Sequence, residues 1–396
     1  MNTKITLSKR VQRIKPSPTL AVAAKAMALQ AEGKNIISLS VGEPDFDTPA
    51  SIREAGINAI HAGKTRYTEV EGTLMLRQAI SEKFKRENNL NYAPADILVS
   101  CGAKQSIHNL MQALLNEGDE VLIPAPYWVS YPDMALLSDA TPVIILATKE
   151  QRYKISAAQL EASITANTRL LIINSPSNPS GMAYTLEELK ALGDVLKKYP
   201  SVAIVSDDMY EHILWSSHPF ANILNACPEL ADRTVVVNGV SKSYAMTGWR
   251  IGYAAGPSHL IAAMKKVQSQ STSNPCSISQ AAAANALSGD QSFIKTMVAA
   301  FKERHDYVVK RVNSIKELSC PAGDGTFYAF IDVTGVIARH PHLKNDIDVS
   351  DMLLNKAEVA VVPGSAFGIE GTIRISYALH LDTLKEALDR MERVLA

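Results

Sequence analysis

The stretch NGVSKSYAMTGWRIGYAAGP, residues 238–257, decides how the rest of the chain is interpreted. It follows three valines and a threonine at 234–237, a β-branched run that predicts a buried strand. Lys242 comes just past that strand, and Arg250 follows a short loop. Burial makes a lysine amine neutral and nucleophilic, whereas an arginine stays charged and suits phosphate. Taken alone, the two side chains are more simply explained as solvated loop charges.

Short apolar segments alternate with amphipathic ones on both sides of this stretch. Capping boxes at Ser156 and Thr185 predict two helix starts. Further strands are predicted at residues 97–100, 120–123, 142–146, 170–173 and 202–205. This alternation favours an α/β fold with a mostly parallel sheet covered by helices on both faces.

The two ends of the chain follow another pattern. Helices dominate beyond residue 257, and a mixed α+β segment follows from residue 327. Near the N-terminus we expect a helix over residues 19–32 with Thr19 as N-cap, and another helix capped by Thr48. We therefore predict a large domain at residues 48–288, and a small domain that combines residues 1–47, including an N-terminal arm, with residues 289–396.

Composition excludes several classes of protein. The 40 basic and 40 acidic residues balance, so the net charge favours neither nucleic acid nor a membrane surface. We find no apolar run long enough for a membrane span or a signal-peptide core, and the four cysteines form no CxxC pair. We expect a cytoplasmic protein without a metal site, and we interpret His340 and His342 as a surface loop.

Polar and aromatic side chains follow the ends of the predicted strands. In open α/β sheets, ligands bind beyond these carboxyl ends. A Gly-Ala-Lys turn at a helix start leaves backbone N–H groups free to hold a phosphate. The residues at this edge are Gly102, Ala103, Lys104, Trp128, Asn178, Asp207, Tyr210, Lys242 and Arg250. Each has an ordinary structural explanation, but together they indicate a pocket for a planar, phosphorylated, pyridine-containing cofactor such as pyridoxal 5′-phosphate (PLP).

Several motifs resemble those of the PLP-dependent class I aminotransferases of fold type I, and among them most closely the bacterial-type aspartate aminotransferases. They span almost the whole chain in the family's order. The matching stretches are SVGEPDFDTP (40–49), RYT (66–68), APYWVSY (125–131), NSPSNPSG (174–181), SDDMYEH (206–212), residues 238–257 and RISY (374–377). The resemblance implies transfer of an amino group between L-aspartate and 2-oxoglutarate, giving oxaloacetate and L-glutamate.

The resemblance also assigns roles to residues. Lys242 matches the lysine that forms the Schiff base, Asp207 the partner of the pyridine nitrogen, and Tyr210 and Asn178 the contacts of the cofactor O3′. Trp128 matches the aromatic that stacks on the ring. The family's contacts to the cofactor phosphate correspond in this chain to Arg250, Gly102, Ala103, Lys104 and Tyr67. Tyr67 matches a tyrosine from the neighbouring subunit, which implies a homodimer with shared sites.

The substrate contacts implied by the resemblance are Arg374 for the α-carboxylate, the backbone of Gly42, and Trp128 and Asn178 beside them. Lys104 matches a lysine that takes the side-chain carboxylate in the bacterial-type subgroup, and Lys15 lies where some members contact prephenate. The chain departs from the family at Gly239, where many members carry a phosphate-binding serine.

Other activities use the same residues. An aromatic- or prephenate-accepting aminotransferase is the first alternative. A PLP β-lyase on the same fold is the second. A PLP-sensing regulator would need an added DNA-binding module, for which this chain has neither spare length nor a basic recognition helix.

Overall fold

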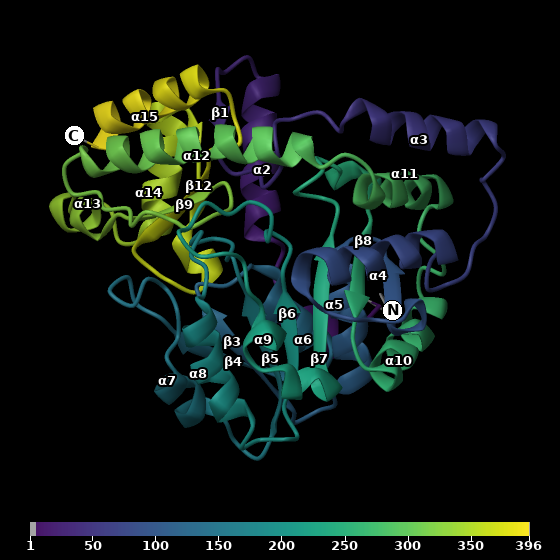
Figure 1. The fold of residues 1–396 in the computed structure, drawn as a ribbon. Helices are drawn as coiled ribbons and strands as arrows, with labels where there is room; N and C mark the ends of the chain where they lie inside the picture. The colour runs from purple at the N-terminus through teal and green to yellow at the C-terminus, as the bar shows by residue number, and fades with distance from the viewer. Residues whose placement is uncertain (1–4, 396) are drawn as a thin grey trace.

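The computed structural model describes residues 5–395. Its central feature is a seven-stranded sheet with the strand order β2-β8-β7-β6-β5-β3-β4 (Figure 1). Its strands are β2 (Ile97–Ser100), β3 (Glu120–Ala125), β4 (Thr141–Leu146), β5 (Thr168–Asn174), β6 (Ala203–Asp207), β7 (Thr234–Gly239) and β8 (Gly252–Ala255). All neighbouring strands are parallel except where β8 pairs with β2 and β7. The predicted mostly parallel sheet is confirmed.

Both faces of the sheet are buried, as the apolar strands require. In β7, Val236 packs into the core on one face, whereas Val235 and Val237 pack into the core on the other. The helices associated with the sheet are α3 (Ala50–His61), α4 (Leu74–Asn88), α5 (Ala103–Leu114), α6 (Ser130–Leu137), α7 (Ala157–Ser163), α8 (Leu186–Leu196), α9 (Ile223–Ala226), α10 (Ser258–Ser269) and α11 (Ser277–Ser288).

The N-terminal segment and the C-terminal third form a second group of elements (Figure 1). The parallel pair of β1 and β10 joins them, and β11, β12 and β9 form a separate antiparallel sheet. The helices of this group are α2 (Pro18–Ala31), α12 (Ser292–Asn313), α13 (Thr334–Arg339), α14 (Asp346–Met352) and α15 (Leu381–Leu395), and its strands are β1 (Ile37–Ser38), β9 (Tyr328–Asp332), β10 (Val359–Ala360), β11 (Val362–Pro363) and β12 (Thr372–Ser376). Helix α1 (Lys9–Arg13) instead packs on α6 of the large-sheet group. The exact domain boundaries stay a prediction.

Two predicted N-caps are wrong. Helix α2 has Ser17 as its N-cap and Pro18 as its first residue, one position before Thr19. Helix α3 has Pro49 as its N-cap, because the Thr48 hydroxyl donates instead to the carbonyl of Ala245 at 2.5 Å. The Thr48 hydroxyl, which the local sequence predicts to cap a helix, is therefore bonded to a backbone carbonyl that is distant in the sequence. The capping boxes that begin α7 and α8 are confirmed.

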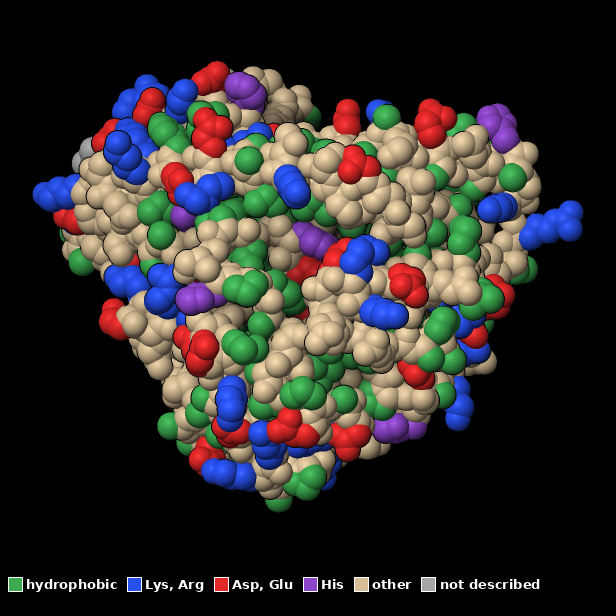
Figure 2. All heavy atoms as spheres, viewed as in Figure 1, with side chains coloured by type: hydrophobic (Ala, Val, Ile, Leu, Met, Phe, Trp, Pro, Cys, Tyr) green, Lys and Arg blue, Asp and Glu red, His purple; other side chains and the backbone are tan. Residues whose placement is uncertain are grey.

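The charge distribution on the visible surface agrees with the equal numbers of acidic and basic residues. Figure 2 shows acidic and basic side chains mixed over the visible face. None of the helices within residues 5–395 has both the length and the apolar character needed to cross a bilayer.

Candidate active site

A cavity of about 270 Å³ lies where the strand ends of the large sheet meet the second group of elements. Most of the predicted site residues line it. These are Gly42, Ala103, Lys104, Trp128, Asn178, Asp207, Tyr210, Lys242, Arg250 and Arg374. They come from segments far apart in the sequence, so the fold has assembled them at one edge of the sheet.

The strand directions explain why Lys242 and Arg250 share this edge. Lys242 follows the carboxyl end of β7, and Arg250 precedes the start of β8. Because β8 runs antiparallel to β7, the start of one strand lies beside the end of the other. The turn between them therefore presents both cations to the same cavity.

Lys242 is held in a partly dry environment. Its Nζ donates to the carbonyl oxygen of Gly42 at 2.6 Å. Burial lowers the pKa of Lys242 to about 8; Glu43 opposes this shift, whereas Arg250 and Arg374 add to it. An amine with such a pKa is partly neutral near pH 8 and can act both as a nucleophile and as a proton carrier.

Asp207 is a buried carboxylate that suits a cationic partner. Burial raises the pKa of Asp207 to about 6. Hydrogen bonds from the Tyr131 hydroxyl, at 2.6 Å, and from the Met209 backbone lower this pKa, but by less than burial raises it. Its neighbour Asp208 does not line the cavity, because it is bound by Asn222 at 2.9 Å and by Ser206 at 2.6 Å. Asp207 is therefore the carboxylate placed to bind a protonated pyridine nitrogen.

The opposite end of the cavity has the character of an anion site. Gly102 precedes α5 with φ of +87°, and a Cβ at this position would lie 2.3 Å from Nη2 of Arg250. Only glycine therefore allows the guanidinium to lie against the start of the helix. The first backbone N–H groups of α5, at Ala103 and Lys104, face the helix N-terminus, where an anion is favoured.

Gly239 is explained by packing rather than by ligand binding. A Cβ there would lie 3.0 Å from both the Ile251 carbonyl oxygen and Cε of Met209. A serine at this position would thus need these neighbours to give way slightly. Ser241 lines the cavity, and its hydroxyl is the available substitute for the missing contact.

Arg374 is a buried cation whose partners are polar or aromatic groups. It is 2 % exposed, and it donates to Oδ1 of Asn178 at 3.1 Å and to the carbonyl of Ser40 at 2.6 Å. Its guanidinium carbon lies 4.5 Å from the ring centroid of Tyr328 and 4.9 Å from that of Phe367. Its Nε is buried without a hydrogen-bond acceptor. A buried guanidinium of this kind is a binding site for a carboxylate.

Lys104 supplies another cation to the cavity. Its Nζ lies 4.9 Å from the ring centroid of Trp128. Burial lowers the pKa of Lys104, and the positive charge of Arg250 lowers it further. An anionic group on a ligand would relieve this repulsion.

Three predicted residues do not line the cavity within this chain: Tyr67, Lys15 and Gly102, the last of which lies against Arg250. Tyr67 is 92 % exposed, and Lys15 is exposed on the N-terminal arm. Conversely, sequence analysis missed several residues that line the cavity: Ser17, Thr19, Leu20, Tyr131 and Tyr328. The signal for Tyr131 was present, since it closes the quoted motif APYWVSY.

Tyr328 links the two halves of the site. Its hydroxyl lies 3.0 Å from that of Tyr210, and its ring packs under Arg374. A Cβ on Gly42 would lie 2.4 Å from the Tyr328 hydroxyl, which explains the glycine in this loop. Tyr210, Arg374 and Gly42, whose carbonyl accepts from Lys242, therefore meet at one side chain.

Comparison with known proteins agrees with this geometry. The family model "Aminotransferase class I and II" matches residues 34–391. The chain is 58% identical to an aspartate/prephenate aminotransferase of Nitrosomonas europaea, over 98% of this chain and 100% of the relative. It is 51% identical to one of Cereibacter sphaeroides, with 98% of both chains covered.

Solved structures give the same result. An aspartate aminotransferase from Rhizobium meliloti superimposes with a TM-score of 0.95 at 47% identity, covering 99% of both chains. One from Thermus thermophilus with maleate superimposes with a TM-score of 0.93 at 38% identity, covering 99% of this chain and 100% of the other. Matches of this extent show that the chain belongs to the class I and II aminotransferase family.

Proposed function

We propose that the protein is a PLP-dependent aminotransferase that moves the amino group between L-aspartate and 2-oxoglutarate, giving oxaloacetate and L-glutamate. The observation that carries this proposal is the pair of cations in one cavity with Lys242. Arg374 is buried and bonded only to neutral groups among the described residues, and Lys104 also lines the cavity. Two cations match a substrate with two carboxylates. The relatives named for aspartate, and the maleate of the Thermus thermophilus structure, support this substrate class.

The residues present fit PLP. Asp207 would bind the pyridine nitrogen, Tyr210 and Asn178 the ring hydroxyl, and Trp128 would cover the ring. The phosphate would be held by Arg250, Ser241 and the start of α5, consistent with the close approach at Gly102. When bound, PLP supplies an aldehyde that exchanges amino groups and a ring that withdraws electrons from the substrate Cα.

The chain itself performs three tasks. Arg374 holds the substrate α-carboxylate through two parallel N–H···O bonds, which orients the Cα–H bond. Lys242 removes this proton as a base and returns one as an acid. Asp207 keeps the ring nitrogen protonated, because its buried negative charge is stabilised by that proton.

Lys104→Ala is expected to raise the KM for aspartate about 10-fold while changing the KM for alanine less than about 2-fold, because only aspartate has a side-chain carboxylate to lose a charged partner. Steady-state kinetics with both donors and 2-oxoglutarate measure this. Equal changes for both donors would remove Lys104 from the substrate site.

Prephenate is a second candidate substrate, favoured by the names of the 58%- and 51%-identical relatives. A coupled assay of several amino donors with 2-oxoglutarate, repeated with prephenate as acceptor, separates the two activities. We expect aspartate with 2-oxoglutarate to give the highest kcat/KM. Lys15→Ala should lower kcat/KM only for prephenate if Lys15 contacts it; an unchanged value would exclude that role.

A cytoplasmic homodimer with shared sites is also part of this proposal. The four cysteines are free, as in a reducing compartment. Exposed apolar side chains of α3 and the start of α4 lie near Tyr67 in the sequence and would be covered by a second copy. They are Ile57, Ile60, Leu74 and Met75.

Mixed dimers test this sharing. Tyr67→Ala is expected to weaken PLP retention about 10-fold, because a phosphate hydrogen bond is lost. In a heterodimer of Tyr67→Ala with Lys242→Ala, one site would regain both wild-type residues and should retain PLP as the wild type does, whereas the other site would carry both substitutions. Retention that stays at the Tyr67→Ala level would show that each site is built from a single chain.

A further inference from the structure

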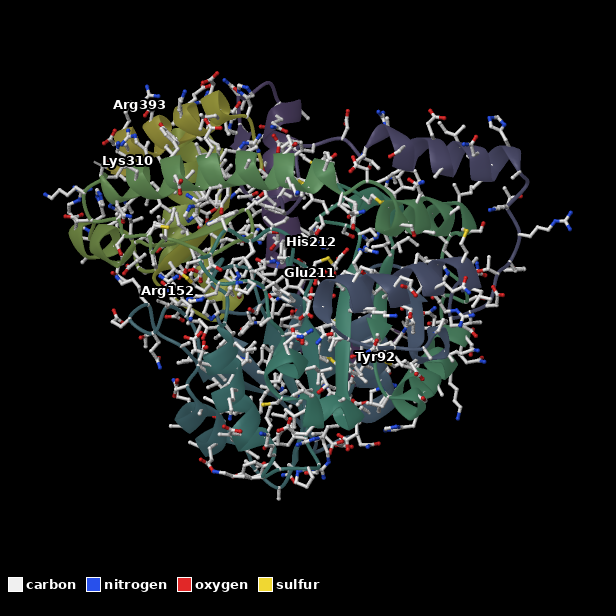
Figure 3. All side chains as sticks on the ribbon, viewed as in Figure 1. Tyr92, Arg152, Glu211, His212, Lys310 and Arg393 are labelled. Atoms are coloured by element: carbon white, nitrogen blue, oxygen red, sulfur yellow. The ribbon has the colours of Figure 1, made fainter. Side chains whose placement is uncertain are left out.

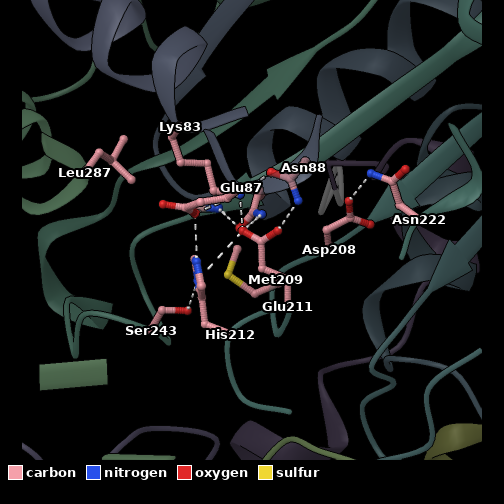
Figure 4. Close-up of polar contacts among 12 residues, drawn as sticks. Lys83, Glu87, Asn88, Asp208, Met209, Glu211, His212, Asn222, Ser243 and Leu287 are labelled. Atoms are coloured by element: carbon pink, nitrogen blue, oxygen red, sulfur yellow. Dashed lines mark hydrogen bonds and ion pairs between the residues drawn. The ribbon is translucent and has the colours of Figure 1, made fainter. Parts of the chain in front are cut away.

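A buried ionic cluster adjoins the candidate active site without lining its cavity (Figure 4). We name it the α4 cluster: Lys83, Glu87 and Asn88 of α4, with Glu211 and His212 of the segment after β6. Figure 3 places Glu211 and His212 at the centre of the molecule, between the sheet and the C-terminal elements. None of these five residues has a role in the aminotransferase function as proposed above.

The cluster is satisfied internally. The fully buried Lys83 ammonium donates to Glu211 and, at 2.7 Å, to Oδ1 of Asn88, and it lies 3.6 Å from Glu87. Asn88 donates to the second oxygen of Glu211 at 2.6 Å. Burial alone would raise the pKa of Glu211, but the charges of Lys83 and His212 lower it below its ordinary value. Glu87, Glu211 and His212 are close enough to share a metal ion, yet the Lys83 ammonium lies within ion-pair distance of both carboxylates.

One contact ties the cluster to both catalytic segments. Asn238 of β7 donates to Oε1 of Glu211 at 2.8 Å. Asn238 lies four residues before Lys242, and Glu211 directly follows Tyr210. The contact therefore fixes the segment that carries the phenol against the strand that leads to the lysine.

A second contact lies even closer to the lysine. His212 bonds through Nδ1 to the hydroxyl of Ser243 at 3.0 Å, and through Nε2 to Glu87 at 2.9 Å. Ser243 directly follows Lys242 in the chain. Both contacts are anchored on α4, a helix that contributes nothing to the cavity lining.

We propose that Glu211 and His212 are positioning residues, which fix the distance between Lys242 and Tyr210 by tying both segments to α4. This inference rests on the proposed aminotransferase function. Proton transfer requires Lys242 Nζ to stay within hydrogen-bond reach of the substrate Cα, and a displacement of about 1 Å can cost about 100-fold in rate. The buried ions of the α4 cluster would resist such a displacement, because separating them leaves uncompensated charge.

Two variants and one control test the proposal in the PLP-loaded enzyme. Glu211→Gln removes the negative charge while keeping the side-chain shape, and Ser243→Ala removes only the bond to His212. The control is Lys154→Met, which breaks the ion pair of the nearly buried Lys154 with Glu188, 2.6 Å apart and outside the cavity lining. The measurements are kcat and KM for aspartate, the melting temperature, and the pH midpoint of the cofactor's visible absorption.

We expect Glu211→Gln to lower kcat about 10- to 100-fold and Ser243→Ala about 3- to 10-fold, with KM changed less than about 2-fold. In both variants the pH midpoint should rise by about 0.5, because a loosened Lys242 gains water. Lys154→Met should lower only the melting temperature. Variants with lower melting temperatures but unchanged kcat and pH midpoint would overturn the proposal. If Glu211→Gln does not fold, Ser243→Ala decides. A wild type without transamination would instead refute the proposed function, and the inference with it.

Discussion

Lys242→Ala should abolish the visible absorption of the lysine-bound cofactor and lower turnover of aspartate with 2-oxoglutarate by at least about 10⁴-fold. The amine is placed by its bond to the Gly42 carbonyl at 2.6 Å, and its pKa of about 8 suits proton transfer. Alanine supplies neither the nucleophile nor the proton carrier. Absorption spectra and single-turnover rates measure the two losses separately.

Lys104→Ala is the matched control for this experiment. It removes another lysine from the same cavity lining and should keep the absorption band. If Lys242→Ala retained both the band and the turnover, the assignment of the whole site would be wrong. If only Lys104→Ala lost the band, the Schiff-base lysine would be Lys104.

Arg374→Leu should lower kcat/KM about 10²- to 10³-fold for every amino donor, because the α-carboxylate is common to all of them and a buried charge partner is lost. Arg374→Lys should recover only part of this loss, since an ammonium cannot form the paired bonds of a guanidinium. Kinetics with aspartate, alanine and an aromatic donor measure both effects.

The contrast with Lys104→Ala makes the Arg374 result decisive. Loss with Arg374→Leu should be uniform across donors, whereas loss with Lys104→Ala should fall on aspartate. A loss restricted to aspartate in Arg374→Leu would exchange the two roles. An unchanged kcat/KM would show that the buried guanidinium serves only the packing of Tyr328 and Phe367.

Local sequence predicted the elements whose signals are local. The strand before Lys242 is apolar because both of its faces are buried, and the capping boxes at Ser156 and Thr185 are complete within four residues. Thr48 misled the prediction because its hydroxyl bonds to Ala245, nearly 200 positions away. Helix α6 was missed because its N-cap, Val129, offers no side-chain cap to the helix that begins at Ser130.

The candidate site shows the same division. Residues at strand ends, such as Asp207 and Lys242, could be placed because all parallel strands end at one edge. Tyr328 could not, because it lies 118 positions from Tyr210 and meets it only in the folded chain. The ties from Glu211 to α4 are equally invisible in sequence, since Lys83 lies 128 positions away.

One mixing experiment tests the central claim most directly. Purified PLP-loaded protein is mixed with aspartate, with the protein in excess and no oxo acid present. One portion is quenched, and its oxaloacetate and ammonia are quantified; 2-oxoglutarate is then added to the unquenched remainder. Transamination predicts stoichiometric oxaloacetate without ammonia, followed by an equal amount of glutamate. Release of ammonia without oxaloacetate before 2-oxoglutarate is added would contradict the account.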